Sequence, residues 1–371
     1  RKIASADGTP GLREQICGRD VYFHNASRAD IPASAAVPGK PVARSDSAIA
    51  VATSDGAIWI GHLRIAETIG AIKLPATTVL AGSIEHLPLT PSPSNIIYSE
   101  VGHVGFLKFP FLNGAMGTEA CRQLTAAFQM ATKRPTRVIV LMGGADFWSN
   151  GIHLNSIEQA ASPADESWHN INAMNDLAQA IITNCRQLTL AALQGNAGAG
   201  GVFLSLAADR IYARKSVILN PHYKSMGNLY GSEYWTYLLP KRVGEKKARE
   251  LTHNRLPIDA LEAQQIGLID DCFELNHADF RKQIEQMVEQ LAASPDYVRL
   301  LAGKCERRAR DEQTKPLAHY RAEELRQMQL NFYGFDPSYH VARYHFVYKI
   351  PHAWTPLYLA RHRRILKTRS K

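Results

Sequence analysis

The chain has 371 residues, of which 45% are hydrophobic and 21% are charged, and this is the composition of an ordinary globular protein. It excludes a mostly disordered, collagen-like or coiled-coil chain, and no apolar run approaches the roughly 20 residues that a membrane span needs. The formal net charge is +9, but residues 361–371 alone contain six Lys or Arg and no acidic residue, so the basic balance is weak evidence for nucleic-acid binding.

Residues 1–65 are expected to form short strands separated by turns. The Asp55-Gly56 pair lies between two such runs, which is a strong hairpin signal. Several short strands without a helix indicate a small β-barrel of the OB type. The expected strands are Lys2–Ala6, Val21–His24, Ala48–Thr53 and Ala57–Leu63. Residues 66–96 contain four prolines and are interpreted as a linker, so we expect one domain over residues 1–90 and a second over 91–371.

After residue 96, apolar strand-like runs alternate with helical patterns. This alternation predicts an α/β layered fold with buried strands. The expected strands are Arg137–Met142, Leu188–Leu193 and Arg210–Ala213, and the expected helices between them are Glu119–Thr132 and Glu166–Cys185. Beyond Gly244 the pattern is mainly helical, with expected helices at Glu245–Thr252, Ile258–Gln265, Asp279–Ala293 and Tyr297–Glu312.

Two glycine-bearing junctions each follow a predicted strand, at Gly143–Leu154 and at Gln194–Gly201. The second departs from the Gly-x-Gly-x-x-Gly spacing of dinucleotide-binding proteins, and close packing of a helix on its strand is a plainer explanation for its glycines. If both junctions face one pocket, backbone N–H groups from the two can converge on one oxygen. That arrangement is an oxyanion hole.

The two junctions resemble the paired signature of the crotonase (enoyl-CoA hydratase/isomerase) superfamily. Trp148–Leu154 is similar to its Phe-x-Ala-Gly-x-Asp-Leu segment, and Gln194–Gly201 is similar to its Asn-Gly-x-Ala-x-Gly-Gly-Gly segment. Ala208–Ala213 and Glu250–Ile269 match later segments of that family, so the resemblance covers about residues 97–350. It implies an α/β fold of the ClpP/crotonase-like ββα superhelix type with a helical C-terminal region, here preceded by the OB-like barrel.

In that family two N–H groups hold the carbonyl of a CoA thioester, and they correspond here to Ile152 and Gly200. The two glutamates of the hydratases are absent, since Phe203 and Tyr223 occupy their positions. Glu233 lies where some relatives carry another acid, beside aromatic residues that would desolvate it and raise its pKa. We therefore expect Glu233, Tyr223, Ile152 and Gly200 to be catalytic. Substrate or CoA binding is expected at Ser149, Asn150, Gly151, His153, Ala199, His222 and Tyr230, with the adenine near Asn150.

Each of these side chains also has a plainer interpretation. Glu233 can be a surface carboxylate at a helix start, and Tyr223 can be a core tyrosine. His153 can cap a helix, and Ser149 can be an ordinary turn residue. The remaining histidines have no metal-ligand spacing, so no metal site is expected.

The N-terminal region resembles a second family, the C-terminal barrel of formyltetrahydrofolate-dependent formyltransferases. The segments that carry this resemblance are Ala4–Gly11, Gly39–Val42 and the Asp55-Gly56 hairpin. Such a barrel fused to a crotonase domain resembles a family of [NiFe]-hydrogenase maturation factors. That resemblance implies an upstream half, absent from this chain, that moves a formyl group from formyltetrahydrofolate to CoA. The crotonase half would then split formyl-CoA into CO and CoA, and the CO would become a ligand of the hydrogenase iron.

Two other classes of function stay open. One is a different crotonase activity on an acyl-CoA, such as hydration, hydrolysis or decarboxylation. The other is a non-catalytic scaffold that binds CoA or RNA, because a relative of the barrel acts on tRNA. We expect a CoA thioester as substrate, an upstream formyltransferase domain and the hydrogenase maturation machinery as partners, and no membrane.

Five cysteines occur without a Cys-x-x-Cys pair. Their odd number and spacing favour reduced thiols and exclude a disulfide framework or a zinc knuckle. The start of the chain has no signal peptide and no initiator Met, so we expect a cytoplasmic protein of which this chain is a piece.

Overall fold

The computed structural model describes residues 8, 10–31, 37–66, 68 and 70–351. Its N-terminal part is a six-stranded antiparallel sheet in the order β1-β2-β5-β4-β3, with β6 paired to β5. The strands are β1 (Leu12–Ile16), β2 (Arg19–Ala29), β3 (Pro41–Arg44), β4 (Ile49–Ala52), β5 (Ala57–Ile65) and β6 (Leu74–Pro75). The predicted hairpin is confirmed, because β4 and β5 pair across the turn that contains Asp55-Gly56.

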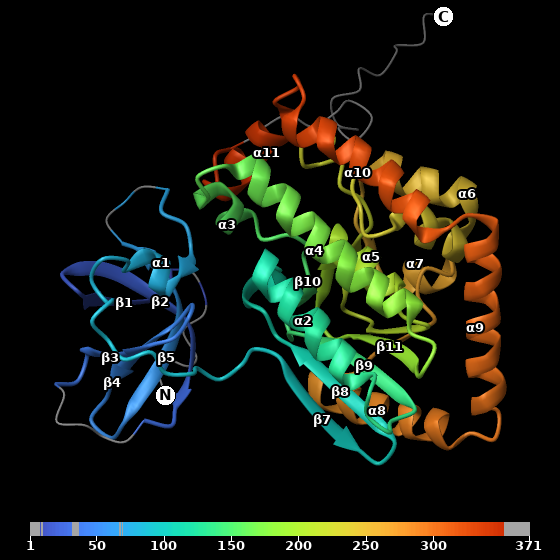
Figure 1. Ribbon diagram of the computed structural model, residues 1–371, viewed down its shortest axis with the longest axis horizontal. Coiled ribbons are helices and arrows are strands. Elements are labelled where there is room, and N and C mark those ends of the chain that lie inside the picture. Colours follow the sequence, from blue (N-terminus) through green and yellow to red (C-terminus); the bar gives the residue numbers. More distant parts are fainter. Residues whose placement is uncertain (1–7, 9, 32–36, 67, 69, 352–371) are drawn as a thin grey trace, which may run out of the picture.

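The predicted linker is shorter than the sequence suggests. Within residues 66–96, β6 continues into helix α1 (Ala76–Val79), and Leu80 and Ile84 are buried in the core of the N-terminal sheet. Arg44 of β3 still pairs with Pro88 and Thr90, so the extended part begins only after Thr90 and leads to the second part of the chain (Figure 1). The expected strand Lys2–Ala6 and the basic segment 361–371 lie outside the described residues.

The second part is built on a mixed sheet in the order β16-β13-β11-β9-β8-β7. Every neighbouring pair is parallel except the β7–β8 hairpin. The strands are β7 (Ile97–Val101), β8 (Val104–Phe109), β9 (Val138–Gly143), β11 (Leu188–Leu193), β13 (Arg210–Arg214) and β16 (Asp271–Phe273). All residues of β9 and β11 are buried, as expected of parallel strands covered on both faces. The three predicted strands are therefore confirmed.

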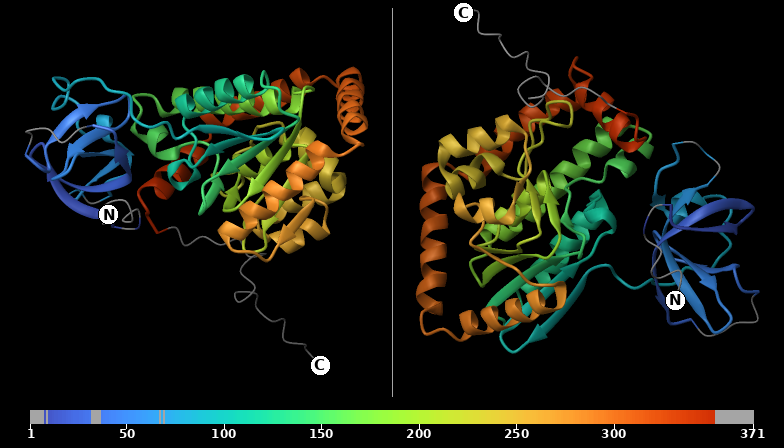
Figure 2. Two further views of the ribbon diagram at one scale, coloured as in Figure 1. Left: turned by 90° about the horizontal axis from the view of Figure 1, so that it is seen from below. Right: turned by 180° about the vertical axis from the view of Figure 1, so that it is seen from behind.

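Helices cover both faces of this sheet (Figures 1 and 2). Helices α2 (Thr118–Ala131) and α4 (Pro163–Thr183) pack on one face, where Leu141 and Leu193 point. Helix α8 (His277–Ala293) packs on the other face, where Val140 and Leu190 point. Adjacent strand residues thus enter different cores, because side chains alternate along a strand.

A second, smaller sheet in the order β10-β12-β14-β15 lies next to the first. Its strands are β10 (Phe147–Ser149), β12 (Asn196–Gly198), β14 (Ile218–Asn220) and β15 (Ile258–Asp259). Strands β10, β12 and β14 follow β9, β11 and β13 closely along the chain, so each turn of the chain adds one strand to each sheet before its helix. This is the ββα superhelix that the sequence predicts.

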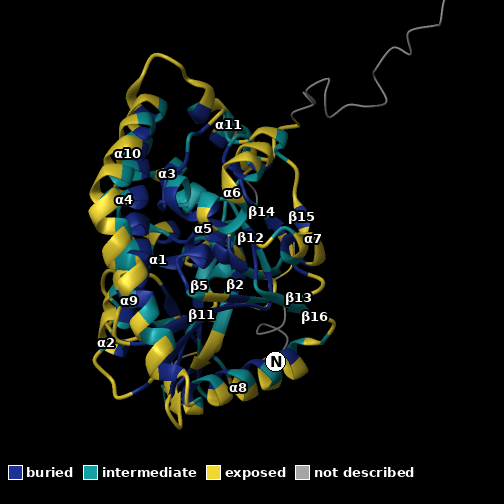
Figure 3. Ribbon diagram, turned by 90° about the vertical axis from the view of Figure 1, so that its right-hand side faces the viewer, coloured by how far each residue is buried: buried dark blue, intermediate teal, exposed yellow. Residues whose placement is uncertain are grey.

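The remaining helices complete the second part of the chain. Helix α6 (Trp235–Asn254) is longer than predicted and kinks at Gly244, whose φ is +77°. Ile258 begins a short strand instead of a helix. The other helical elements are η2 (Leu112–Gly114), α3 (Leu154–Gln159), α5 (Gly200–Leu206), α7 (Ala260–Gln265), α9 (Tyr297–Thr314), α10 (Leu317–Tyr333) and α11 (Ser338–Val347). In Figure 3, exposed residues lie on the outer sides of the long helices and buried ones toward the sheets.

Candidate active site

The two glycine-bearing junctions lie side by side in the structure. Parallel pairing of β10 with β12 places Ser149 opposite Ala197. A Cβ atom on Gly201 would lie 2.0 Å from the carbonyl oxygen of Ser149, and a Cβ atom on Gly151 would lie 3.2 Å from the nitrogen of Gly200. The backbones therefore approach so closely that a side chain at Gly201 would force the junctions apart.

Backbone N–H groups are available at this meeting point. Gly200 and Gly201 begin α5, so their N–H groups have no acceptor within the helix. Ala199, which precedes them, is held at a φ of +47° and donates its N–H to the Asn220 carbonyl at 2.9 Å. Within the described part of the chain, the N–H of Ile152 meets no acceptor. Two residues of the sequence prediction, Ile152 and Gly200, are thus close together with free donors.

Glu233 faces Gly200 from a strained turn. Both Glu233 and Tyr234 adopt left-handed backbone conformations, with φ of +59° and +60°, which are costly for residues other than glycine. The Glu233 side chain is 1% exposed, and a Cβ atom on Gly200 would lie 2.8 Å from its Oε1. Among the described residues, no group donates a hydrogen bond to Oε1. Burial raises the pKa of Glu233 to about 8.

Tyr223 is the hydrogen-bond partner of that carboxylate. Its hydroxyl donates to Oε2 of Glu233 and lies 2.9 Å from the Ser232 carbonyl oxygen. Phe203 stacks on the Tyr223 ring at a centroid distance of 5.0 Å. Burial raises the pKa of Tyr223 well above its usual value, so the phenol is neutral at physiological pH. Gly231 lies against the ring, where a Cβ atom would be 2.0 Å from Cδ2 of Tyr223.

Two further polar residues, which the sequence analysis did not select, hold the Glu233 turn. Asn175 on α4 accepts hydrogen bonds from Ser232 Oγ at 2.7 Å and from the Glu233 N–H at 2.8 Å. Glu324 on α10 accepts from the Tyr234 N–H at 3.0 Å. Both side chains are fully buried. Their only sequence signal is a polar residue at a helix position that points into the core, and that signal becomes visible only once the packing is known.

Other predicted residues lie around this centre. Asn150 donates through Nδ2 to the Asn113 carbonyl at 2.8 Å, and its Oδ1 would lie 3.0 Å from a Cβ atom on Gly198. Buried Ser149 accepts the Gly151 N–H at 3.1 Å, which is a turn contact. Tyr230 packs on Trp235 at 5.5 Å.

The two predicted histidines have different surroundings. Nδ1 of His153 accepts the Ser156 N–H at 3.1 Å, so this residue caps α3, and its ring stacks on His62 of the N-terminal sheet at 6.4 Å. Burial lowers the pKa of His153 and lowers that of His62 to about 3. His222 is buried beside Tyr223, and burial lowers its pKa as well.

Trp148 does not line this centre. Its indole is buried in the core, donates toward the Leu141 carbonyl at 3.4 Å and packs edge-on against Phe109 at 5.4 Å. Phe203 is therefore the residue of the two whose ring packs against Tyr223.

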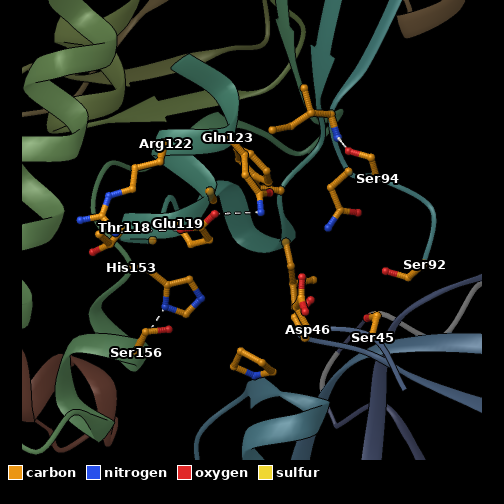
Figure 4. Close-up of a pocket in the computed structure, with 18 of the residues that line it drawn as sticks. Ser45, Asp46, Ser92, Ser94, Thr118, Glu119, Arg122, Gln123, His153 and Ser156 are labelled. Carbon is orange, nitrogen blue, oxygen red and sulfur yellow. Dashed lines mark hydrogen bonds and ion pairs between the residues drawn. The ribbon is translucent and has the colours of Figure 1, made fainter. Parts of the chain in front are cut away.

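A cavity of about 1130 Å³ lies between the N-terminal sheet and the second part of the chain. Figure 4 shows Ser45 and Asp46 of the N-terminal part facing Arg122 and Gln123 of α2 across it, with His153 at one side. Its lining is rich in hydroxyl groups, and Glu233, Tyr223 and Gly200 are not part of it. The cavity thus reaches the first glycine-bearing junction at His153 but does not reach the buried Glu233.

No group of three or more His, Cys, Asp or Glu side chains suited to a metal ion is found in residues 8–351 as described. Among the described helices, none is both long enough and apolar enough to cross a membrane.

A family model described as Enoyl-CoA hydratase/isomerase matches residues 102–333. This chain therefore belongs to the enoyl-CoA hydratase/isomerase family, which confirms the resemblance carried by its two glycine-bearing junctions. The structure of an enoyl-CoA hydratase from Bacillus halodurans matches with a TM-score of 0.55 at 17% identity, covering 69% of this chain and 99% of that one, and shows the likeness of the fold.

Two other relatives match nearly the whole chain, including its N-terminal sheet. The chain is 51% identical over 367 residues to the hydrogenase maturation factor HoxX of Bradyrhizobium diazoefficiens, which covers 98% of this chain and 64% of HoxX. The crystal structure of HypX from Aquifex aeolicus in complex with tetrahydrofolic acid matches with a TM-score of 0.92 at 43% identity, covering 98% of this chain and 66% of HypX. These matches confirm the resemblance to hydrogenase maturation factors. The chain spans slightly less than two thirds of the length of either relative.

Proposed function

We propose that this chain is the C-terminal part of an enzyme that converts formyl-CoA to CO and CoA and thereby supplies the CO ligand for [NiFe]-hydrogenase maturation. The observation that carries this proposal is the buried Glu233, whose unoccupied Oε1 faces Gly200 and whose Oε2 is bound by Tyr223. The likeness to HoxX and HypX supports the biological setting.

Decarbonylation of a formyl thioester needs one proton to be moved from carbon to sulfur and two bonds, C–H and C–S, to be broken. The formyl C–H bond breaks, and its electron pair stays on the carbon as the lone pair of CO. The C–S bond breaks with its pair going to sulfur, and the proton removed from carbon ends on the thiolate. Atoms and electrons balance without an oxidant or a metal, so a single acid–base group near the carbonyl is sufficient.

The site offers one such group. Glu233 has a pKa of about 8, so near neutral pH it is mostly protonated but keeps an ionised fraction, and it can accept the formyl proton and return it to sulfur. The N–H groups of Ile152 and Gly200 would hold and polarise the formyl oxygen. Tyr223 would orient the carboxylate through its hydroxyl. Burial of the acid would keep water from hydrolysing the thioester.

The rest of the CoA molecule would extend from this centre toward the cavity beside His153. Ser149, Asn150, Gly151 and Ala199 would contact it through the two junctions, and the cavity, about 1130 Å³ in volume, would give room to its polar parts. His222 and Tyr230 would lie on the acyl side. In the full-length protein, tetrahydrofolate would bind only in the upstream formyltransferase half, and the hydrogenase maturation machinery would receive the CO.

Water addition by two carboxylates is disfavoured, because Phe203 and Tyr223 stand at the two hydratase positions and stack on each other. Phe203 is fully buried and carries no carboxylate, so the first hydratase position supplies no acid.

The test is to incubate the purified chain with formyl-CoA and, separately, with crotonyl-CoA, and to detect CO by the absorption spectrum of haemoglobin. We expect CO from formyl-CoA, loss of that signal in Glu233→Gln and a weakened signal in Tyr223→Phe. Hydration of crotonyl-CoA without CO would replace this proposal with an ordinary crotonase activity. Tight CoA binding without turnover would indicate a scaffold, and salt-sensitive RNA binding would indicate its nucleic-acid form.

A further inference from the structure

The turn that carries Glu233 is held by hydrogen bonds from two helices. Asn175 Oδ1, on α4, receives both the Ser232 hydroxyl and the Glu233 N–H, at 2.7 and 2.8 Å. These two bonds fix the backbone at the point where the catalytic side chain leaves it. A left-handed Glu233 persists only because its surroundings over-determine it, and Asn175 supplies part of that constraint.

The second support is a carboxylate. Oε2 of Glu324 accepts the Tyr234 N–H at 3.0 Å, and Oε1 accepts the Thr236 N–H at 2.9 Å and the Thr236 hydroxyl at 2.5 Å. The Glu324 side chain is fully buried, and its carboxylate lies at the N-terminal end of α6. The three donors satisfy the hydrogen-bonding capacity of this carboxylate when it is ionised. Burial nevertheless raises the pKa of Glu324 to about 7. Glu324 is thus a second acid at this turn, bonded to Tyr234, the second residue of the strained pair, and to Thr236 in the first turn of α6.

The groups that face Glu233 differ in whether they can change charge near neutral pH. Tyr223, from the loop after β14, and Cys121, from α2, have pKa values raised by burial and stay neutral. The contacts from α4 and α5 come from an asparagine and a glycine, which do not titrate. Among the described residues, Glu324 from α10 is therefore the group whose negative charge opposes ionisation of Glu233 near neutral pH.

We propose that Asn175 and Glu324 are positioning residues for Glu233: Asn175 fixes the backbone of the acid, and Glu324 holds the following turn and repels negative charge on Glu233. This inference rests on the proposed role of Glu233 in CO release. Both residues act through the strained turn, and Glu324 makes the basicity of the catalytic acid depend on a helix near the C-terminal end of the fold.

The experiment compares Glu324→Gln with Glu323→Gln. Both substitutions remove one charge from adjacent positions of α10, but Glu323 is solvent-exposed and pairs with Lys315. Carboxyl signals from protein labelled with carbon-13 at glutamate are titrated by NMR, and the Glu233 signal is assigned by its absence in Glu233→Gln. The pH profile of kcat for CO release is measured in parallel.

In the wild-type protein we expect a two-step Glu233 titration, because coupled carboxylates share their protons. In Glu324→Gln the curve becomes a single step with its midpoint at lower pH, and the acidic limb of kcat moves the same way. Glu323→Gln leaves both unchanged. Asn175→Ala lowers kcat about 100-fold at unchanged KM, and Asn175→Asp, which keeps the accepting oxygen, retains more activity.

A Glu233 midpoint that is the same in Glu324→Gln and in the wild type overturns the charge role, and a wild-type kcat in Asn175→Ala overturns the backbone role. If Glu324→Gln does not fold, a single-step wild-type titration is enough to reject the coupling. If no protein releases CO, the proposed function fails, while the NMR titration still decides whether Glu324 controls Glu233.

Discussion

Replacing Tyr223 by phenylalanine tests whether Glu233 must be ionised to react. The substitution removes the hydroxyl that donates to Oε2 of Glu233 and keeps the ring that stacks on Phe203. With a pKa of about 8, Glu233 is ionised to about one tenth at pH 7. A hydrogen bond to a charged group contributes about 1.5–3 kcal/mol. Its loss would lower the ionised fraction of Glu233 at pH 7 by about one to two powers of ten.

We therefore expect kcat for CO release by Tyr223→Phe to fall by that factor at pH 7 and to recover as the pH is raised toward about 9.5. The measurement is the initial rate of CO release from formyl-CoA, followed with haemoglobin, over this pH range. Tyr212→Phe is the matched control, because Tyr212 lies on β13 against Phe273, remote from Glu233. A loss of equal size at every pH would refute the reasoning, since it would mean that Tyr223 acts otherwise than on the ionisation of Glu233.

Three further predictions concern stability. The pKa of Glu233 is about 8 in the folded protein against an ordinary 4.5, so the folded state binds this proton more tightly than the unfolded chain does. The free energy of unfolding therefore falls, by at most about 5 kcal/mol, as the pH rises from 4.5 to 8. Thermal unfolding should therefore show Glu233→Gln more stable than the wild type at pH 9 and equal to it near pH 4; a constant difference would contradict this. Phe203→Ala should lower the free energy of unfolding in urea by about 3–5 kcal/mol, because Phe203 is fully buried, and a loss below about 1 kcal/mol would show that the site collapses. Gly201→Ala should destabilise the protein, because its Cβ atom would be forced against the Ser149 carbonyl. Gly303→Ala, in the middle of α9, should instead stabilise the protein by about 0.5–1 kcal/mol. Equal melting temperatures for the two variants would reject the close approach of the junctions.

The main strands could be predicted because their signal is local. The continuous apolar runs Val138–Gly143 and Leu188–Leu193 are buried on both faces and need no knowledge of their neighbours. The strands β10 and β12 are three residues long and carry glycine or polar residues, so no periodicity marks them. The sequence predicts a helix only after Gly244, whereas α6 begins at Trp235 and buries Tyr237, Leu238 and Leu239 before the kink at Gly244.

The residues of the candidate site also differ in whether a local sequence pattern marks them. Ile152 and Gly200 were found because each junction has a sequence pattern, and Glu233 because its position matches that of an acid in related proteins. Asn175 and Glu324 lie 58 and 90 residues from the backbone groups that they bind. Only tertiary packing brings them to the turn, so no local pattern could have indicated them.

The bond between Glu324 and the Tyr234 N–H ties the proposed catalytic centre to α10. Detachment of α10 would break this bond and expose Met328 and Phe332, which pack in the same core as the main sheet, so the left-handed turn would lose one of its supports. Hydrogen exchange in α10 should therefore report the fraction of molecules that are competent to react. A small molecule or a neighbouring protein that loosens this helix would switch the reaction off without touching the thioester.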